Sequence, residues 1–136
     1  MSKSIPKISK YMTTTPFSIE AKESVTRALE IMKEKDIRHL PVMRDSQVIG
    51  MLTDRDVKTM LSLTVPGMNT SKILAEDVCS DKPYTTKPEA LLNEVASEMA
   101  ENKYGSAVVI DHGKLVGIFT AMDACKALSD ICEQRF

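Results

Sequence analysis

The sequence predicts a mixed α/β fold of the α+β type, built from two copies of a unit that reads strand, helix, strand, strand, helix. Three observations predict it: an internal repeat, an amphipathic stripe in each copy, and paired strand-like runs after each stripe. Residues 9–61 align with residues 76–128 without a gap, so that Pro16 corresponds to Pro83, with eight identities in 53 positions. A unit of about fifty residues is too small to bury a sheet face alone, so we expect the copies to pack together.

The first helix of each copy is predicted from apolar residues at positions i, i+3, i+4 and i+7. In the first copy these are Val25, Ala28, Leu29 and Met32, and the corresponding residues of the second copy are Leu92, Val95, Ala96 and Met99. Short extended stretches at 17–19 and 84–86 come before the helices. Pro88 is expected at the first position of the second helix, where a missing N–H group costs nothing.

Each predicted helix is followed by two strand-like runs and a last helix. The runs cover residues 40–43 and 48–52, and then 107–110 and 115–119. Four polar residues separate the two runs of each pair, which is typical of a hairpin turn. The last helices are expected near 54–63 and 121–131, the second with an apolar stripe of Ala124, Ala127, Leu128 and Ile131.

The composition is that of a compact globular protein. Its 136 residues are 43% hydrophobic and 27% charged, close to the average of folded domains. No apolar run is long enough to cross a bilayer, and residues 1–7 lack the apolar stretch of a signal peptide, so we expect a cytoplasmic protein without a membrane partner. The net charge of -1 argues against nucleic acid as a partner. Residues 1–67 hold eleven Lys and Arg against eight Asp and Glu, so any anion site is expected to draw its cations from this half.

The repeat also sets the expected domain limits. We expect one repeat at residues 7–64 and the other at 74–133. The connection at 65–73 contains Val65, Pro66 and Gly67, which is typical of a linker, and it is short enough to keep the copies adjacent.

No pattern of residues indicates catalysis or metal binding. The chain has no P-loop, no nucleophile beside a base and no pair of histidines at metal spacing, so we expect that it is not an enzyme. The three cysteines, Cys79, Cys125 and Cys132, are odd in number and unpaired in spacing, which indicates reduced thiols and no metal site. His112 falls in a predicted hairpin turn, where a solvated side chain is expected.

The repeat preserves one polar pair, Thr53 with Asp56, which returns as Thr120 with Asp123. Each pair stands where a predicted strand gives way to a helix. In one interpretation the threonine caps the helix and the aspartate completes a capping box. In the other, the helix N-terminus and the threonine hydroxyl bind phosphate, while the aspartate accepts hydrogen bonds from two ribose hydroxyls.

The runs at 38–42 and 50–56, repeated at 105–109 and 117–123, resemble a tandem pair of CBS (cystathionine β-synthase) domains, the Bateman module. The resemblance extends from about Lys7 to Leu128. It implies two βαββα repeats with approximate two-fold symmetry, their sheets facing each other, helices outside, and two clefts between the repeats. It also implies a stand-alone, non-catalytic sensor without an obligatory cofactor, which binds AMP, ADP, ATP or S-adenosylmethionine, forms a homodimer and regulates an unidentified effector protein.

The resemblance assigns a role to each matching residue of this chain. Asp56 and Asp123 are expected to bind ribose, and the residues expected near phosphate are Thr53, Thr120, Arg55, His39 and Arg38. His39 also fits a plain interpretation as a polar residue at a strand end. The residues expected around the base are Thr14, Pro16, Leu40, Pro41, Lys82, Pro83, Tyr84, Ala107 and Val108, together with the backbone at Thr15.

We expect the two clefts to be unequal, because Gly105 and Met122 replace the cations Arg38 and Arg55 in the second copy. Our hypothesis is that the cleft with Arg55 accepts a polyphosphate. The cleft of Thr120 and Asp123 then binds a less charged ligand, a ligand held by borrowed cations, or none. Two alternatives stay open: an assembly module in which both polar pairs are only helix caps, and an enzyme whose substrate lies between the halves.

Overall fold

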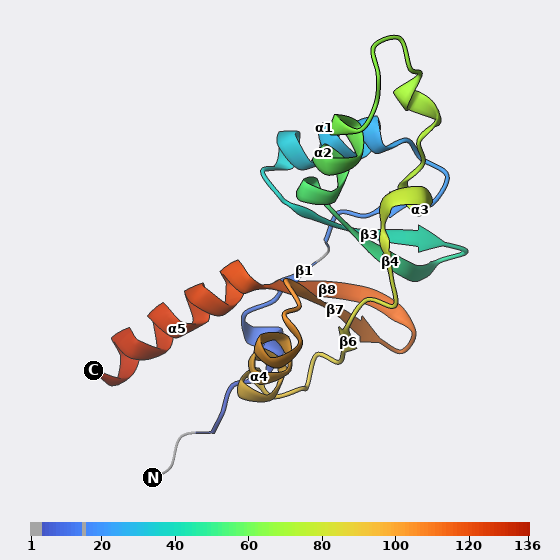
Figure 1. Cartoon of the computed structure of the whole chain (residues 1–136). Coiled ribbons are helices and arrows are strands. Elements are labelled where there is room, and N and C mark those ends of the chain that lie inside the picture. Colours follow the sequence, from blue (N-terminus) through green and yellow to red (C-terminus); the bar gives the residue numbers. More distant parts are fainter. Residues whose placement is uncertain (1–3, 15) are drawn as a thin grey trace. The chain divides into compact units, whose positions relative to one another are not determined.

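The computed structural model describes residues 4–14 and 16–136, so the expectation for Thr15 lies outside the described residues. The chain folds into two compact units (Figure 1). Unit 1 contains the N-terminal segment to Pro16 together with Tyr84–Phe136, and unit 2 contains Phe17–Pro83. Two four-stranded sheets and five α helices are present in the described residues, which confirms the mixed α/β class.

Unit 2 is built on a sheet with the strand order β2-β3-β4-β5. Strand β2 (Ile19–Glu20) runs parallel to β3 (His39–Arg44), and β3 forms an antiparallel hairpin with β4 (Gln47–Thr53). Strand β5 (Ser80–Asp81) completes the other edge. The helices of this unit are α1 (Val25–Lys35), α2 (Asp54–Ser62), the 3-10 helix η2 (Thr70–Lys72) and α3 (Ala75–Val78).

Unit 1 repeats this arrangement with the strand order β1-β8-β7-β6. Strand β6 (Thr85–Thr86) runs parallel to β7 (Ser106–Asp111), and β7 forms a hairpin with β8 (Lys114–Thr120). Strand β1 (Thr13–Thr14) pairs with β8 in the antiparallel sense. The helices of this unit are the 3-10 helix η1 (Ile8–Lys10), α4 (Leu92–Asn102) and α5 (Ala121–Arg135).

Both hairpins turn in two residues, so their strands are longer than the sequence predicted. Asp45 and Ser46 have φ values of 51° and 65°, and His112 and Gly113 have values of 50° and 78°. Two successive residues with positive φ match the right-handed twist of the flanking strands. The outer residues of each predicted four-residue turn therefore belong to the strands.

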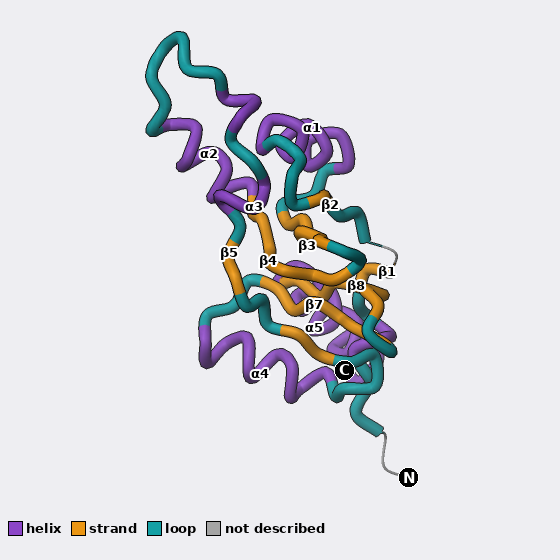
Figure 2. Tube along the Cα trace, turned by 90° about the vertical axis from the view of Figure 1, so that its right-hand side faces the viewer, coloured by secondary structure: helices purple, strands orange, loops and turns teal. Residues whose placement is uncertain are grey.

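The hydrophobic cores confirm the predicted helical stripes. Val25, Ala28 and Met32 of α1 pack with Val57 of α2 against the β3–β4 hairpin, and Figure 2 shows both helices on one side of this hairpin. The core residues of unit 1 follow the same pattern, and they include Leu92, Val95, Met99, Ala107, Val109, Phe119 and Ala127. The prediction for Leu128 was wrong: its side chain is 65% exposed, whereas Ala127 of the same helix is buried.

The expected position of Pro88 was also wrong. Helix α4 begins at Leu92, with Leu91 as its N-cap residue. Pro88 lies in the preceding turn, where its carbonyl oxygen accepts a hydrogen bond from the Ser9 N–H at 3.1 Å. The Ala90 carbonyl accepts another from the Ile8 N–H at 2.8 Å. These two hydrogen bonds join the turn at residues 88–90 to η1, and α4 begins only after this turn.

Each unit takes an edge strand from the segment that precedes the other unit's main hairpin in the sequence. Strand β1 pairs with β8, with Thr14 opposite Gly117, and β5 pairs with β4, with Asp81 opposite Gly50. Strands β1 and β5 occupy corresponding positions of the internal repeat. The compact units therefore divide the chain at other residues than the repeats expected at 7–64 and 74–133. Each edge strand joins the unit that holds the hairpin of the other repeat, where it satisfies N–H and C=O groups that β4 or β8 would otherwise expose.

Glu76 of helix α3 forms ion pairs with two other residues of unit 2. The Glu76 carboxylate accepts a hydrogen bond from Lys22 Nζ at 2.9 Å and forms an ion pair with Arg44. The hydrogen bond from Lys22, and after it the one from Arg44, lower the pKa of Glu76 below its usual value. Since these partners favour the charged carboxylate, they stabilise the folded state only while Glu76 is ionised.

We predict that Gly50→Ala destabilises the protein more than Gly117→Ala. A Cβ atom at Gly50 would overlap the Ser80 carbonyl oxygen of β5 and lie 2.7 Å from the Cys79 Sγ atom. A Cβ atom at Gly117 would first meet the Met12 Sδ atom at 2.6 Å, and this side chain can move aside. The expected cost at Gly50 is about 1–3 kcal/mol, measured by urea denaturation. Equal midpoints for the two variants would contradict the close packing of β5.

We predict that Glu76→Gln lowers stability at pH 7 and that the loss disappears in acid. The folded-state pKa of Glu76 lies below the usual value of a glutamate side chain. Its contribution is therefore complete above the unfolded-state pKa, and it is lost as the pH falls through the lowered folded-state pKa. Urea midpoints of both proteins, measured from pH 7 down to pH 3, check this. A difference that is constant across this range would show that charge has no role.

Candidate functional site

The candidate site of unit 2 lies at the end of its sheet where β4 gives way to α2. Thr53 is the last residue of β4 and lies opposite His39, the first residue of β3. The Asp54 N–H donates to the Arg38 carbonyl oxygen at 3.1 Å. These pairings bring Arg38, His39 and Thr53 to one end of the sheet. In unit 1, Ser106 likewise lies opposite Thr120, and the Ala121 N–H donates to the Gly105 carbonyl at 3.1 Å.

In unit 1 the Thr120 and Asp123 pair forms a complete capping box. The Asp123 N–H donates to Thr120 Oγ1 at 3.2 Å, and the Asp123 carboxylate accepts from the Thr120 N–H at 3.0 Å. The same carboxylate oxygen lies 3.5 Å from Thr13 Oγ1 of β1, which donates a long hydrogen bond to it. Asp123 is only 7% exposed. Its carboxylate is therefore occupied by the start of its own helix and by the added strand.

In unit 2 the corresponding carboxylate, that of Asp56, is exposed to solvent. Thr53 caps α2, because its Oγ1 atom accepts from the Asp56 N–H at 3.1 Å. The Asp56 side chain is exposed and has no hydrogen bond or ion pair within the part of the chain that the structure describes. Two carboxylate oxygens are therefore available beside the positive end of a helix.

The added strands account for this difference. In the internal repeat, Ser80 of β5 corresponds to Thr13 of β1. Ser80 Oγ donates instead to the Met51 carbonyl oxygen at 3.1 Å. The Ser80 hydroxyl therefore donates within the sheet, and Asp56 receives no hydrogen bond from the described residues of β5.

Two arginines lie at the end of unit 2, and the repeat does not preserve them in unit 1. Arg38 and Arg55 line a hollow of about 430 Å³ together with Lys58, Asp54, Thr59 and Ser62. Neither guanidinium group has a hydrogen bond or ion pair with any residue in the described ranges 4–14 and 16–136. His39 is half-buried at the start of β3. The counterparts of Arg38 and Arg55 in unit 1 are Gly105 and Met122, so that end has no such pair.

The residues expected around a base are divided between the units. Leu40 and Ala107 are fully buried in the cores beneath the helices. Pro41 and Val108 are buried as well, on the opposite faces of their sheets, because side chains alternate along a strand. Lys82 and Pro83 follow β5 and run away from Thr53, since Ser80 is the residue that lies opposite Met51.

The remaining members of this set lie in unit 1. Thr14 is exposed in β1, and Pro16 follows it half-buried. The Tyr84 ring stacks on Tyr104, with a distance of 5.2 Å between ring centroids. Burial raises the pKa of the Tyr84 hydroxyl. This ring already has an aromatic partner, which the sequence prediction did not include.

Three residues with polar contacts at these ends were missed from the sequence: Thr13, Ser80 and Lys58. Thr13 and Ser80 correspond to each other in the same repeat as the recognised pairs, so the repeat itself could have identified them. Lys58 lies one turn after Asp54, and its Nζ atom is 3.4 Å from Asp54 Oδ2. Its position at i+4 places it beside Asp54 on the helix surface.

Within the described residues, no group of three or more His, Cys, Asp or Glu side chains is placed to hold a metal ion. The three cysteines are free thiols, and burial raises the pKa of Cys79. None of the described helices has the length and apolar character needed to span a membrane.

The sequence profile of the CBS domain matches residues 8–62 and again residues 75–130. The chain belongs to the CBS domain family. Its two matches make it a tandem CBS domain pair of 136 residues.

Several curated proteins are similar in sequence to this CBS domain pair. Hypoxic response protein 1 of Mycobacterium tuberculosis is 31% identical over 79% of this chain and 75% of its own length. The CBS domain-containing protein YhcV of Bacillus subtilis is 28% identical over 82% of this chain and 78% of its own. Inosine-5'-monophosphate dehydrogenase of Korarchaeum cryptofilum is 27% identical over 90% of this chain, which spans only 24% of that enzyme.

Solved structures show the same fold. The CBS domain pair of protein MJ0100, in complex with 5'-methylthioadenosine and S-adenosyl-L-methionine, has a TM-score of 0.83 at 20% identity, over 94% of this chain and 99% of that one. CBSX2 in complex with AMP has a TM-score of 0.76 at 25% identity, over 93% and 98% of the two chains. Hypoxic Response Protein I with two coordinated zinc ions has a TM-score of 0.74 at 28% identity, over 89% and 98%.

We predict that Asp123→Ala destabilises the fold more than Asp56→Ala. The first substitution removes the acceptor of the Thr120 N–H and the Thr13 hydroxyl, and should cost about 1–2 kcal/mol. The second removes only a favourable charge at a helix N-terminus, worth about 0.3–1 kcal/mol. Urea denaturation of both variants measures the difference. A larger loss for Asp56→Ala would show that its carboxylate has structural partners.

Proposed function

We propose that this CBS domain pair is a regulatory module that binds an adenosine-containing ligand at the end of unit 2 formed by Thr53 and Asp56. The observation that carries the proposal is the open Asp56 carboxylate at the start of α2, beside two guanidinium groups that have no partner in the described residues. The structure of the similar protein CBSX2 in complex with AMP supports this class of ligand. CBS domain pairs are generally regulatory, which supports a non-catalytic role.

The chemistry of this end suits a nucleotide. The Asp56 carboxylate can accept hydrogen bonds from both hydroxyls of a ribose. The N-terminus of α2 attracts a phosphate, and the Thr53 hydroxyl can donate to it. Arg38 and Arg55 offer planar groups with several donors for phosphate oxygens, and His39 lies at the same end of the sheet.

We assign a different role to the pair in unit 1. A ligand that needed the Asp123 carboxylate would have to displace the Thr120 N–H and the Thr13 hydroxyl. Thr120 and Asp123 therefore serve as a helix cap, and one adenosine site per chain is proposed. This observation favours the assembly interpretation for that end only. The homodimer, the effector protein, the cytoplasmic location and the base pocket remain predictions.

Isothermal titration with AMP, ATP, S-adenosylmethionine and GMP tests the proposal. At least one adenosine ligand should bind, and Asp56→Ala should weaken its binding by about tenfold or more, because a charged acceptor for the ribose is lost. Asp123→Ala is the matched control, since it removes the equivalent carboxylate from unit 1, and it should bind as the wild type does once circular dichroism shows that it is folded.

Binding of no adenosine compound, or equal affinity of the wild type and Asp56→Ala, would overturn the proposal. Chromatography of the ligand after incubation covers the enzymatic alternative. Recovery of unchanged ligand supports a regulatory module, whereas consumption of the ligand would assign an enzyme.

A further inference from the structure

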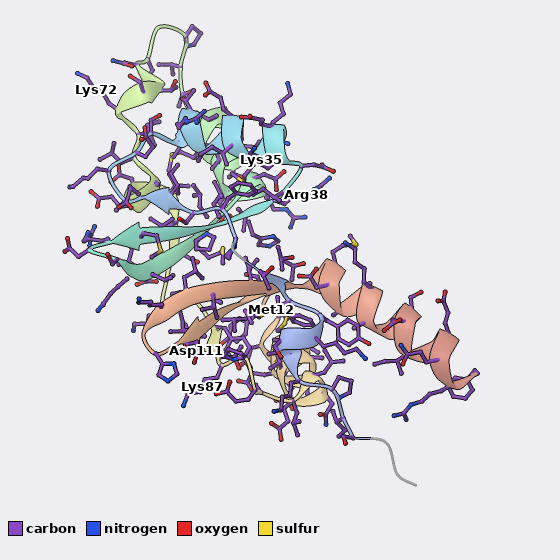
Figure 3. The ribbon with its side chains drawn as sticks, turned by 180° about the vertical axis from the view of Figure 1, so that it is seen from behind. Met12, Lys35, Arg38, Lys72, Lys87 and Asp111 are labelled. Atoms are coloured by element: carbon purple, nitrogen blue, oxygen red, sulfur yellow. The ribbon has the colours of Figure 1, made fainter. Side chains whose placement is uncertain are left out.

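Unit 1 contains a hollow at the opposite end of the β7–β8 hairpin from Thr120. It has a volume of about 870 Å³, and it is formed by the connection between β6 and α4 and by the turn of the hairpin. Four ionisable side chains line it: Lys87, Glu89, Asp111 and His112. Figure 3 shows Lys87 and Asp111 at this end of the unit. No residue of this hollow belongs to the candidate adenosine site of unit 2.

The corresponding place in unit 2 is filled by a charged side chain of the chain itself. One carboxylate oxygen of Glu76 pairs with Lys22 Nζ at 2.9 Å, and the other pairs with the Arg44 guanidinium group. The Glu76 side chain is only 18% exposed. Lys22, from the connection between β2 and α1, and Arg44, at the end of β3, therefore form a clamp that holds a group of the opposite charge.

The backbone of unit 1 has the same arrangement. The Glu76 N–H donates to the Ala21 carbonyl oxygen at 3.0 Å, and the Ser9 N–H donates to the Pro88 carbonyl oxygen at 3.1 Å. In the internal repeat, Ser9 is the counterpart of Glu76 and Pro88 is the counterpart of Ala21. Ser9 is exposed, and its side chain is short and uncharged. Unit 1 therefore keeps the backbone of the clamp and lacks the charged group at its centre.

The two clamp positions carry the opposite charge in unit 1. Glu89 corresponds to Lys22 and Asp111 corresponds to Arg44, and both carboxylates line the hollow. Glu89 has no hydrogen bond or ion pair within residues 4–14 and 16–136. Asp111 Oδ1 lies 3.0 Å from His112 Nδ1, and this pair is ionic only when the imidazole is protonated. Two carboxylates thus line a space whose equivalent in unit 2 holds a charged group.

We propose that this hollow binds a guanidinium group between the carboxylates of Glu89 and Asp111. The arrangement is the charge-reversed counterpart of the Glu76 clamp, in which two cations share one carboxylate. A guanidinium group has five N–H donors in one plane, so it can donate to two carboxylates at once. A metal ion is a poorer occupant, because the described residues offer no group of three metal ligands. The inference does not depend on the adenosine site.

The guanidinium group can belong to an arginine side chain of a partner protein or to free arginine, and Lys87 distinguishes these two sources. Its ammonium group lines the same hollow and has no ion pair in the part of the chain that the structure describes. Free arginine carries an α-carboxylate that this ammonium group can bind. An arginine within a polypeptide has no α-carboxylate, so its binding does not require Lys87.

Titration of the isotope-labelled full chain with N-acetyl-L-arginine amide and with free L-arginine, followed by NMR at the amides of His112 and Gly113, tests this. Both compounds should bind, and N-acetyl-L-citrulline amide, their neutral analogue, should bind about tenfold more weakly or not at all. Asp111→Asn and Glu89→Gln should each weaken binding by about tenfold, because a charged acceptor is lost. Glu101→Gln is the matched control, since it removes an exposed carboxylate of α4 that does not line the hollow.

The outcomes separate the two sources. Equal binding of both arginine compounds, unchanged in Lys87→Ala, supports the site and assigns it to a side chain of a partner protein. Tighter binding of free arginine that Lys87→Ala abolishes supports the site and assigns it to the amino acid. The site is overturned if neither compound binds, if the citrulline compound binds as well as the arginine compound, or if Asp111→Asn and Glu89→Gln bind as Glu101→Gln does.

Discussion

The structure depends on the pairing of two short edge strands with hairpins that lie far from them in the sequence. β1 completes the sheet of unit 1 and β5 completes that of unit 2. Each strand contributes two residues, yet each covers the edge of a hairpin whose last strand leads into a helix, α2 or α5. Gly50 and Gly117 permit this pairing, since a side chain at either position would meet the added strand. The edge strands therefore set both the packing of each unit and the surroundings of the polar pair beside it.

One motif forms two different arrangements of hydrogen bonds in this chain. Thr120 and Asp123 close on each other, with Thr13 as an additional donor. Thr53 caps its helix in the same way, but Asp56 keeps its carboxylate exposed. The stabilising use and the binding use of an acidic residue at a helix N-terminus are therefore alternatives. A carboxylate that satisfies its own backbone is no longer available to a ribose.

The sequence predicted the features that depend on periodicity. The helical stripes, the hairpins and the repeat follow from patterns of four or more residues, and the structure has them. The edge strands β1 and β5 were not predicted, because a strand of two residues shows no alternation of apolar and polar side chains. The partner of β1, strand β8, also lies about a hundred residues further along the chain. The different hydrogen bonding of the Asp56 and Asp123 carboxylates could not be predicted from the sequence either. Thr13 and Ser80 are chemically similar, and only the three-dimensional structure shows that one reaches a carboxylate whereas the other bonds to a carbonyl. Lys58 belongs to a cluster that exists only once α2 and Arg38 are brought together.

The exchange of strands also determines how the chain passes between the units. Unit 2 is one continuous stretch, and the backbone enters it after Pro16 and leaves it at Pro83. These two crossings are the covalent joints between the units, and a proline with a restricted φ angle stands at each. The backbone therefore connects α2 with unit 1 only through these two joints. One of them follows β5, so the edge strand that pairs with β4 is also the segment that leads the chain back into unit 1.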